Sequence, residues 1–143
     1  MKKISIVIPV YNESDTLHDF SIRLKAVIDN LTNYQWECIF VNDGSSDQSL
    51  SILRTLSMPC DNFKVLDFSR NFGKENALTA GVHEASSSDA VICIDADLQH
   101  PPELIPKLIN AWVDDIDIVA TVRTGIDKQP ILRRIGSKSF YWL

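Results

Sequence analysis

The sequence predicts an α/β domain with a mostly parallel sheet flanked by helices, and two patterns support this fold class. Short, β-rich apolar runs alternate with longer segments whose apolar residues recur at helical spacing. Polar residues gather directly after the predicted strands. The chain has 143 residues, of which 45% are hydrophobic, so it is long enough to form one domain with a substantial core.

The first half of the chain contains two pairs of a strand and a helix. The run 4–10 is apolar and rich in β-branched residues, which predicts a strand. Segment 16–31 predicts an amphipathic helix because its apolar residues recur every three or four positions. A second apolar run, 37–41, predicts the next strand. The polar segment 42–47 is then expected to form a turn with a helix cap, and 48–57 a short helix.

The second half continues the alternation. The run 63–68 predicts a third strand, and 74–85 a helix rich in small residues. The run 90–94 is apolar throughout, so we expect a strand that is buried on both faces of the sheet. A last helix is expected to start at the proline pair 101–102, because proline is tolerated in the first turn. The apolar run 116–122 predicts a fifth strand.

Charge and cysteine content exclude several classes of protein. The formal net charge of −5 argues against a general affinity for nucleic acid, whose phosphates would be repelled. The three cysteines are widely spaced and odd in number, which suits neither a disulfide framework nor a CxxC metal site. Cys38 and Cys93 lie in apolar runs, so both are expected to be buried structural residues.

Membrane and targeting signals are weak. The start leads directly into a strand pattern without the apolar run and cleavage site of a signal peptide. No run approaches the roughly 20 apolar residues that span a bilayer. We therefore expect the chain as given to be soluble or at most peripheral.

Polar side chains follow each of the five predicted strands. In a parallel sheet the carboxyl ends of the strands lie at one edge, where ligands of such folds bind. Acids and amides at these positions also turn the chain and cap helices, but five such loops at one edge favour a shared site. The residues are Tyr11, Asn12, Glu13, Asn42, Asp43, Arg70, Asn71, Asp95, Asp97 and Arg123.

The sharpest feature is the sequence DADLQ at 95–99, at the end of an apolar strand. Asp95 and Asp97 are two apart, which places both carboxylates on one face if the strand geometry continues. Two carboxylates that close call for a cation or for raised pKa values. A hard divalent ion with oxygen ligands is the economical answer, with Gln99 as a third ligand and substrate phosphates completing the shell. This predicts a site for a nucleoside diphosphate.

Other residues near these loops are interpreted individually. Arg123 is placed to hold the same diphosphate, since a guanidinium can bind two oxygens at once. Asp43 is assigned to the nucleotide, whereas Asp47 is expected to be purely structural. His100 beside two prolines is interpreted as a loop residue rather than a metal ligand. Neither GxGxxG nor GxxxxGK[ST] is present, so the dinucleotide fingerprint and the P-loop are absent.

Four ordered motifs together resemble the second family of glycosyltransferases. They are IPVYNE at 8–13, NDGSSD at 42–47, FSRNFGKE at 68–75 and DADLQHPPE at 95–103. The resemblance is to the branch of dolichol-phosphate mannosyltransferase and the bacterial polyprenyl-phosphate glycosyltransferases, and the third motif looks like the bacterial branch. It implies a Rossmann-like GT-A fold and inverting transfer of a sugar from a nucleotide donor to a polyprenyl phosphate, in cell-envelope glycan synthesis.

Carried over position by position, the resemblance implies a donor site. Pro9, Tyr11, Glu13, Val41 and Asp43 would line the base and ribose of a UDP- or GDP-sugar. Asp95, Ala96 and Asp97 would also contact the nucleotide sugar, and Asp95, Asp97 and Gln99 would hold Mg²⁺ or Mn²⁺ with the diphosphate. Arg123 would bind the phosphates, so that Asp97 and Arg123 are the expected catalytic residues.

The resemblance also implies that the chain is truncated. We expect a catalytic domain at 1–127 and, at 128–143, the start of an amphipathic segment on the acceptor or membrane side. That segment interleaves aromatic residues with Arg133 and Arg134, which suits an anionic membrane surface or the acceptor phosphate. The longer protein is then expected at the cytoplasmic face of the inner or plasma membrane.

Two alternative functions remain at this stage. A related enzyme would use a sugar hydroxyl as acceptor in polysaccharide synthesis and would need a carboxylate base. A polyprenyl phosphate oxygen is already anionic, so it needs less help from a general base. The other alternative is a non-catalytic module that binds a nucleotide sugar.

Overall fold

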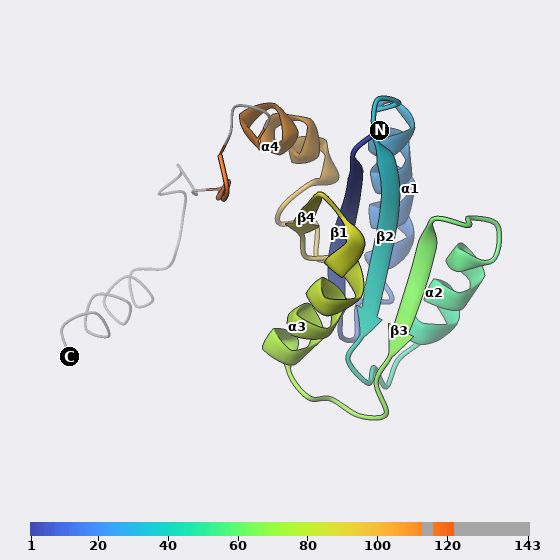
Figure 1. The fold of residues 1–143 in the computed structure, drawn as a ribbon. Coiled ribbons are helices and arrows are strands. Elements are labelled where there is room, and N and C mark those ends of the chain that lie inside the picture. The colour runs from blue at the N-terminus through green and yellow to red at the C-terminus, as the bar shows by residue number, and fades with distance from the viewer. Residues whose placement is uncertain (113–115, 122–143) are drawn as a thin grey trace, which may run out of the picture.

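A computed structural model describes residues 1–112 and 116–121 and contains a four-stranded parallel sheet (Figure 1). The strand order is β3-β2-β1-β4, so the first strand lies inside the sheet and the fourth at its edge. The strands are β1 (Lys3–Val10), β2 (Gln35–Asn42), β3 (Phe63–Asp67) and β4 (Ala90–Cys93). The α-helices are α1 (Leu17–Asp29), α2 (Ser49–Ser57), α3 (Lys74–Glu84) and α4 (Ile105–Trp112), with short 3₁₀ turns at Ala85–Ser87 and Pro102–Leu104.

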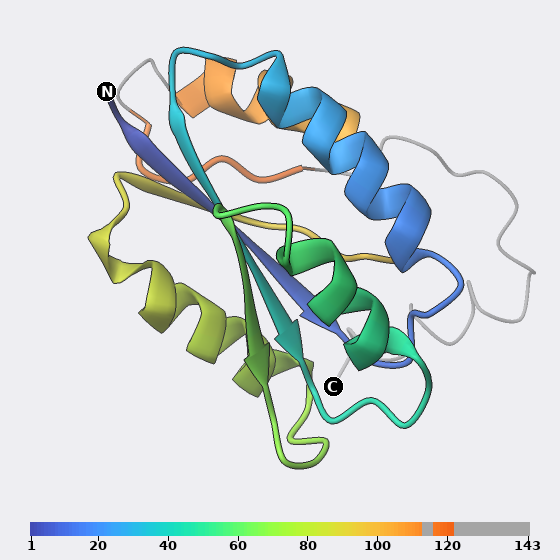
Figure 2. The ribbon, with the colours of Figure 1, turned by 90° about the vertical axis from the view of Figure 1, so that its right-hand side faces the viewer.

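Helices cover both faces of the sheet, as the view along its plane shows (Figure 2). Side chains alternate along β1, and Ile4, Ile6 and Ile8 join a core that also contains residues of α1, α2 and α4. Val7 points to the other face, where it packs with Ala77 of α3. The sheet is thus buried between two apolar layers, which is why its inner strands read as continuous hydrophobic runs.

Helix α3 lies close to the sheet because its residues are small. A Cβ atom added at Gly81 would come within 2.3 Å of Cγ1 of Val7 and 3.1 Å of Cγ2 of Val41. Any larger residue here would push the helix away from β1 and β2. The small-residue composition of this segment therefore sets the distance between helix and sheet, and with it the position of the helix N-terminus.

An ionic cluster around a buried glutamate joins the strands near their amino-terminal ends. Glu37 of β2 is only 8% exposed, and its carboxylate accepts hydrogen bonds from Ser5 at 2.9 Å and pairs with Lys3 at 3.1 Å and Lys64 at 2.9 Å. Ser5 in turn contacts Ser88, just before β4, at 2.7 Å. One carboxylate therefore joins strands β1, β2 and β3, and through Ser5 the start of β4.

The structure confirms the α/β class and the expected elements up to α4. Their bounds shift by one or two residues, except that α4 begins at Ile105, after a 3₁₀ turn at the expected proline start. The structure corrects the prediction for β4. That strand is half exposed, with Val91 37% accessible and Cys93 also exposed, rather than buried on both faces. The cause is its place at the sheet edge, since α3 packs mainly on β1 and β2. Cys38 is buried as expected, and burial raises the pKa of its thiol to about 12, so it is no nucleophile.

The expected fifth strand is also not formed by residues 116–121. A hollow of about 670 Å³ lies between β4, α4 and this segment, and it is lined by Val91, Trp112 and Thr121 among others. Without a neighbouring strand at hydrogen-bonding distance, an apolar run has no ladder to join. Ile118 accordingly stays 84% exposed. Val122, the last residue of the predicted strand, lies outside the described residues.

Within the described part of the chain, no helix is long and apolar enough to cross a bilayer. The expected domain boundary after residue 127 and the amphipathic segment 128–143 lie outside the described residues. Both stay predictions.

Candidate functional site

A groove of about 210 Å³ opens at the carboxyl ends of the strands, as expected for this class of sheet. This is the lower end of the view in Figure 1, where the loops after β1, β2 and β3 come together. The groove is smaller than the hollow beside β4, but the acidic residues of the sequence motifs meet here. Its lining residues are Pro9, Val10, Tyr11, Glu13, Asp43, Asn71, Gly73, Lys74, Asp95, Ala96 and Asp97.

Hydrogen bonds join the loop after β1 to the loop after β2. The side-chain oxygen of Asn12 accepts from the backbone N–H of Ser46 at 2.8 Å, and the Asn12 N–H donates to Oγ of Ser45 at 3.0 Å. Asn12 has a positive φ of 55°, a conformation that asparagine tolerates better than most residues. The Glu13 N–H also donates to Oγ of Ser49 at 2.9 Å. The two loops therefore form one wall of the groove.

Asp47 stabilises this wall of the groove, which agrees with the structural role that the sequence predicted for it. Its carboxylate accepts from the backbone N–H of Ser49 at 2.9 Å and of Ser14 at 3.0 Å. Partial burial opposes ionisation, but these hydrogen bonds outweigh it and lower the pKa of Asp47 to about 2. The negative charge is thus held at the start of α2, where the helix dipole also favours it.

Asp43 holds the loop after β3. The side chain is only 3% exposed, and its two oxygens accept from the backbone N–H groups of Phe72 at 2.7 Å and Gly73 at 2.9 Å. Gly44 adds a close approach, because a Cβ atom there would lie 2.3 Å from the carbonyl carbon of Arg70. Its φ of +64° also favours glycine. The DG pair therefore docks one loop onto the other.

The acidic motif after β4 faces the same groove. Lys74, the first residue of α3, places its Nζ atom 2.7 Å from both carboxylate oxygens of Asp95. Asp97 accepts from the backbone N–H of Gln99 at 2.9 Å, which turns the chain directly after the motif. Leu98 between them has a φ of 61°, a strained value for a branched residue. The turn thus keeps the Asp97 carboxylate at the groove.

The carboxylates of the groove fit a divalent ion that takes its remaining ligands from the phosphates of a substrate. The described residues hold no group of three or more histidine, cysteine or acidic side chains that could bind a metal. Mg²⁺, however, is bound by one or two carboxylates together with substrate phosphates and water. Asp95 and Asp97, which both line the groove, satisfy this requirement.

Most of the predicted site residues meet in this groove. Pro9, Tyr11, Glu13, Asp43, Asp95, Ala96 and Asp97 all line it. Val41 is fully buried under α3, so its side chain cannot contact a nucleotide in this arrangement. Gln99 is not among the lining residues, and its backbone N–H donates to the Asp97 carboxylate. Arg123, Arg133 and Arg134 lie outside the described residues.

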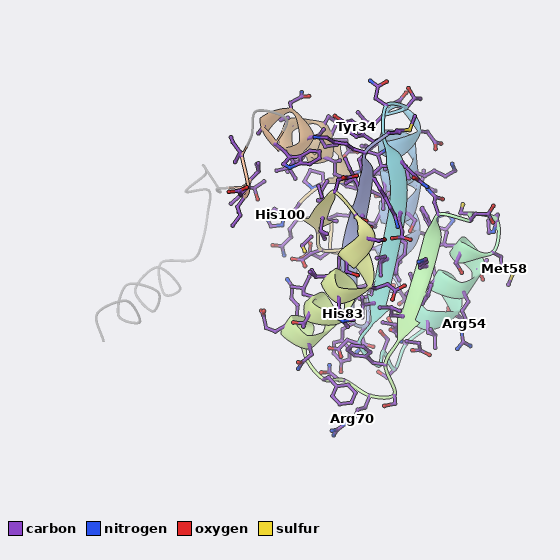
Figure 3. All side chains as sticks on the ribbon, in the orientation of Figure 1. Tyr34, Arg54, Met58, Arg70, His83 and His100 are labelled. Carbon is purple, nitrogen blue, oxygen red and sulfur yellow. The ribbon has the colours of Figure 1, made fainter. Side chains whose placement is uncertain are left out.

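Sequence reasoning missed several residues of the site. It expected Asn71 at this edge of the sheet, but it named Gly73 and Lys74 only within the family motif FSRNFGKE, and both line the groove. Arg70, which was expected at the site, instead points away from the domain over the ring of Phe72 (Figure 3). A lysine directly after a glycine at a helix start was the available signal for Lys74.

Comparison with known proteins shows the family of this chain. The family model described as glycosyl transferase family 2 matches residues 5–142. The chain belongs to glycosyl transferase family 2. An uncharacterized glycosyltransferase of Bacillus subtilis is 45% identical over 139 residues, which is 97% of this chain and 42% of that protein.

Two relatives of this family 2 chain carry more specific names. A prophage bactoprenol glucosyl transferase homolog of Escherichia coli is 40% identical over 141 residues, covering 99% of this chain and 45% of the relative. An undecaprenyl-phosphate 4-deoxy-4-formamido-L-arabinose transferase of Salmonella paratyphi A is 37% identical over 139 residues, covering 96% and 42%. The chain thus spans less than half the length of these relatives.

Solved structures agree on the fold. Staphylococcus aureus TarS 1–349 in complex with UDP superposes with a TM-score of 0.59 at 18% identity, covering 88% of this chain and 40% of that one. Identity this low supports the fold alone. The family 2 chain therefore has the GT-A fold that its motifs implied.

Proposed function

We propose that the protein transfers a sugar, with inversion, from a nucleoside diphosphate sugar to a polyprenyl phosphate in cell-envelope glycan synthesis. The observation that supports this most strongly is the groove in which Asp95 and Asp97 meet the loops after β1 and β2. Relatives named for bactoprenol and undecaprenyl phosphate support the lipid acceptor. Staphylococcus aureus TarS 1–349, which shares the fold, was solved in complex with UDP, and a nucleoside diphosphate donor agrees with this.

The donor binds along the groove in this proposal. Pro9 and Tyr11, a residue that is 47% exposed, flank the base at one wall, and Glu13 lies at the ribose. Asp43 lines the same wall while it anchors the backbone of Phe72 and Gly73. A base stacked on an aromatic side chain gains contact area without a strict requirement for one nucleotide, which suits either a uridine or a guanosine donor.

The diphosphate lies at the acidic end of the groove. Mg²⁺ or Mn²⁺, when bound there, neutralises charge on the leaving nucleoside diphosphate. Asp95 and Asp97 hold that ion, and the turn at Leu98 and Gln99 orients the Asp97 carboxylate. Arg123 is assigned to the phosphates on the family resemblance, and its position lies outside the described residues.

The acceptor determines which chemistry the chain must supply. A polyprenyl phosphate oxygen is anionic near neutral pH, so it attacks the anomeric carbon without a strong general base. Stabilising the leaving group is then the main task. Arg133 and Arg134 are proposed to meet the acceptor phosphate or an anionic lipid surface at the cytoplasmic face of the membrane, and both lie outside the described residues.

A transfer assay with two acceptors tests this function. Membranes containing the protein are incubated with labelled UDP- and GDP-sugars and either undecaprenyl phosphate or an oligosaccharide. We expect label in the lipid fraction, in a form that mild acid releases as sugar. Label only in the oligosaccharide would favour polysaccharide synthesis. Donor binding without transfer to either acceptor would favour a binding module.

A further inference from the structure

Lys74 has no role in the site as described so far, although it occupies a central position. Its ammonium lies 2.7 Å from both oxygens of Asp95 and therefore stands where a cation would bind this carboxylate. The two residues come from different elements, the start of α3 and the loop after β4. The pair bridges the groove beside the expected diphosphate position.

A purely structural role does not account for this pair. The side chains are 55% and 30% exposed, and salt bridges this exposed contribute little to stability. The start of α3 is already fixed by Asp43, which binds the backbone of Phe72 and Gly73. The fold therefore does not depend on Lys74 to position this loop.

The charges of the groove point to a role in binding. Glu13, Asp43, Asp95 and Asp97 line it, and among its described lining residues Lys74 is the only cation. A diphosphate entering such a groove would meet four carboxylates. One divalent ion offsets part of that repulsion, and an ammonium released from Asp95 would offset more.

The surroundings allow the ammonium to move. Lys74 also lines a second hollow of about 220 Å³ next to the groove, with Leu78 and His100 among its neighbours. The exposed side chain thus lies between two open spaces. A lysine is a flexible point charge on a four-carbon stem, so it can exchange partners at little cost.

We propose that Lys74 is a donor-binding residue whose ammonium competes with the divalent ion for Asp95 and pairs with the donor's diphosphate once the ion displaces it. This inference rests on the proposed function, because it requires that a nucleoside diphosphate and a divalent ion share the groove. It makes one distinctive prediction. Removing the ammonium should strengthen metal binding and weaken nucleotide binding.

The test compares Lys74→Met with the unchanged protein in two calorimetric titrations. Mn²⁺ is titrated without nucleotide, and UDP and GDP are titrated in saturating Mn²⁺. In the variant we expect Mn²⁺ to bind about fivefold to tenfold more tightly and the nucleotide about tenfold more weakly, the size of one charge pair near a protein surface. Lys74→Arg should keep both affinities close to those of the unchanged protein.

Lys25→Met is the matched control, since Lys25 pairs with Asp29 on the surface of α1 and lies outside the groove. It should change neither affinity. Tighter Mn²⁺ binding together with weaker nucleotide binding by Lys74→Met supports the proposal. Unchanged affinities, or a loss of both, would overturn it. If the unchanged protein binds Mn²⁺ and nucleotide normally, such a failure leaves the proposed function standing. If it binds neither, both proposals fail.

Discussion

We expect Asp97→Asn to lower the rate of sugar transfer by about 100-fold or more, because a metal-bound leaving group is worth several kcal/mol in the transition state. The amide keeps an oxygen that can accept the hydrogen bond from the Gln99 N–H, so the turn after the motif should survive. The variant therefore removes the charge without removing the local geometry. Initial rates from labelled donor to undecaprenyl phosphate measure the effect.

Asp61→Asn provides the matched control for this loss. Asp61 is exposed between α2 and β3 and does not line the groove, so the same change of charge there should leave the rate within about twofold. A rate of Asp97→Asn within a factor of about three of the unchanged protein would remove Asp97 from the catalytic residues. Circular dichroism of the variant should match that of the unchanged protein.

The second large effect concerns stability. Glu37→Ala should lower the free energy of unfolding by about 2–3 kcal/mol, because it leaves Lys3 partly buried without its carboxylate. The loss is expected below the full value for a deeply buried pair, since Lys64 is 47% exposed. Urea unfolding at neutral pH measures it. Glu84→Gln is the control, because Glu84 also pairs with Lys64 but is 41% exposed and should cost about 0.5 kcal/mol or less.

The same cluster predicts a dependence on pH. Burial opposes ionisation of Glu37, but hydrogen bonds from Lys64, Lys3 and Ser5 outweigh it and hold the pKa of this carboxyl below its ordinary value of 4.5. Its contribution is therefore complete above pH 4.5 and is lost as the pH falls through the lower folded pKa. The stability difference between the unchanged protein and Glu37→Ala should shrink over that interval. A constant difference down to pH 3 would contradict the assignment.

The sequence was sufficient for the fold wherever local pattern decides structure. The apolar runs at β1 and β2 predicted strands, and the structure buries both strands inside the sheet. The run at β4 is just as apolar, but its exposure depends on where the strand lies in the sheet and on which helix covers it. Strand order is a tertiary property, so the exposed Val91 and Cys93 could not be read from the run itself.

The sequence predicted the acidic residues of the site better than the hydrogen bonds that hold its loops in place. Asp95 and Asp97 stand out because carboxylates interrupt an apolar run, and the structure brings both to the groove. The anchoring of Phe72 and Gly73 by Asp43 joins residues about thirty positions apart, and nothing local marks it. Glu37 and Ser5 were visible as polar residues within strands. Their shared cluster depends on the register between β1 and β2.

Calorimetric titration of the protein with UDP and GDP, in Mn²⁺ and in excess chelator, tests the central claim most directly. If Asp95 and Asp97 share a divalent ion with the diphosphate, at least one nucleotide should bind at least about tenfold more tightly with Mn²⁺ than without it. Mg²⁺ should support the same binding. Equal affinity with Mn²⁺ and with chelator, or no binding of either nucleotide, would contradict the assignment of this groove to a metal-dependent donor site.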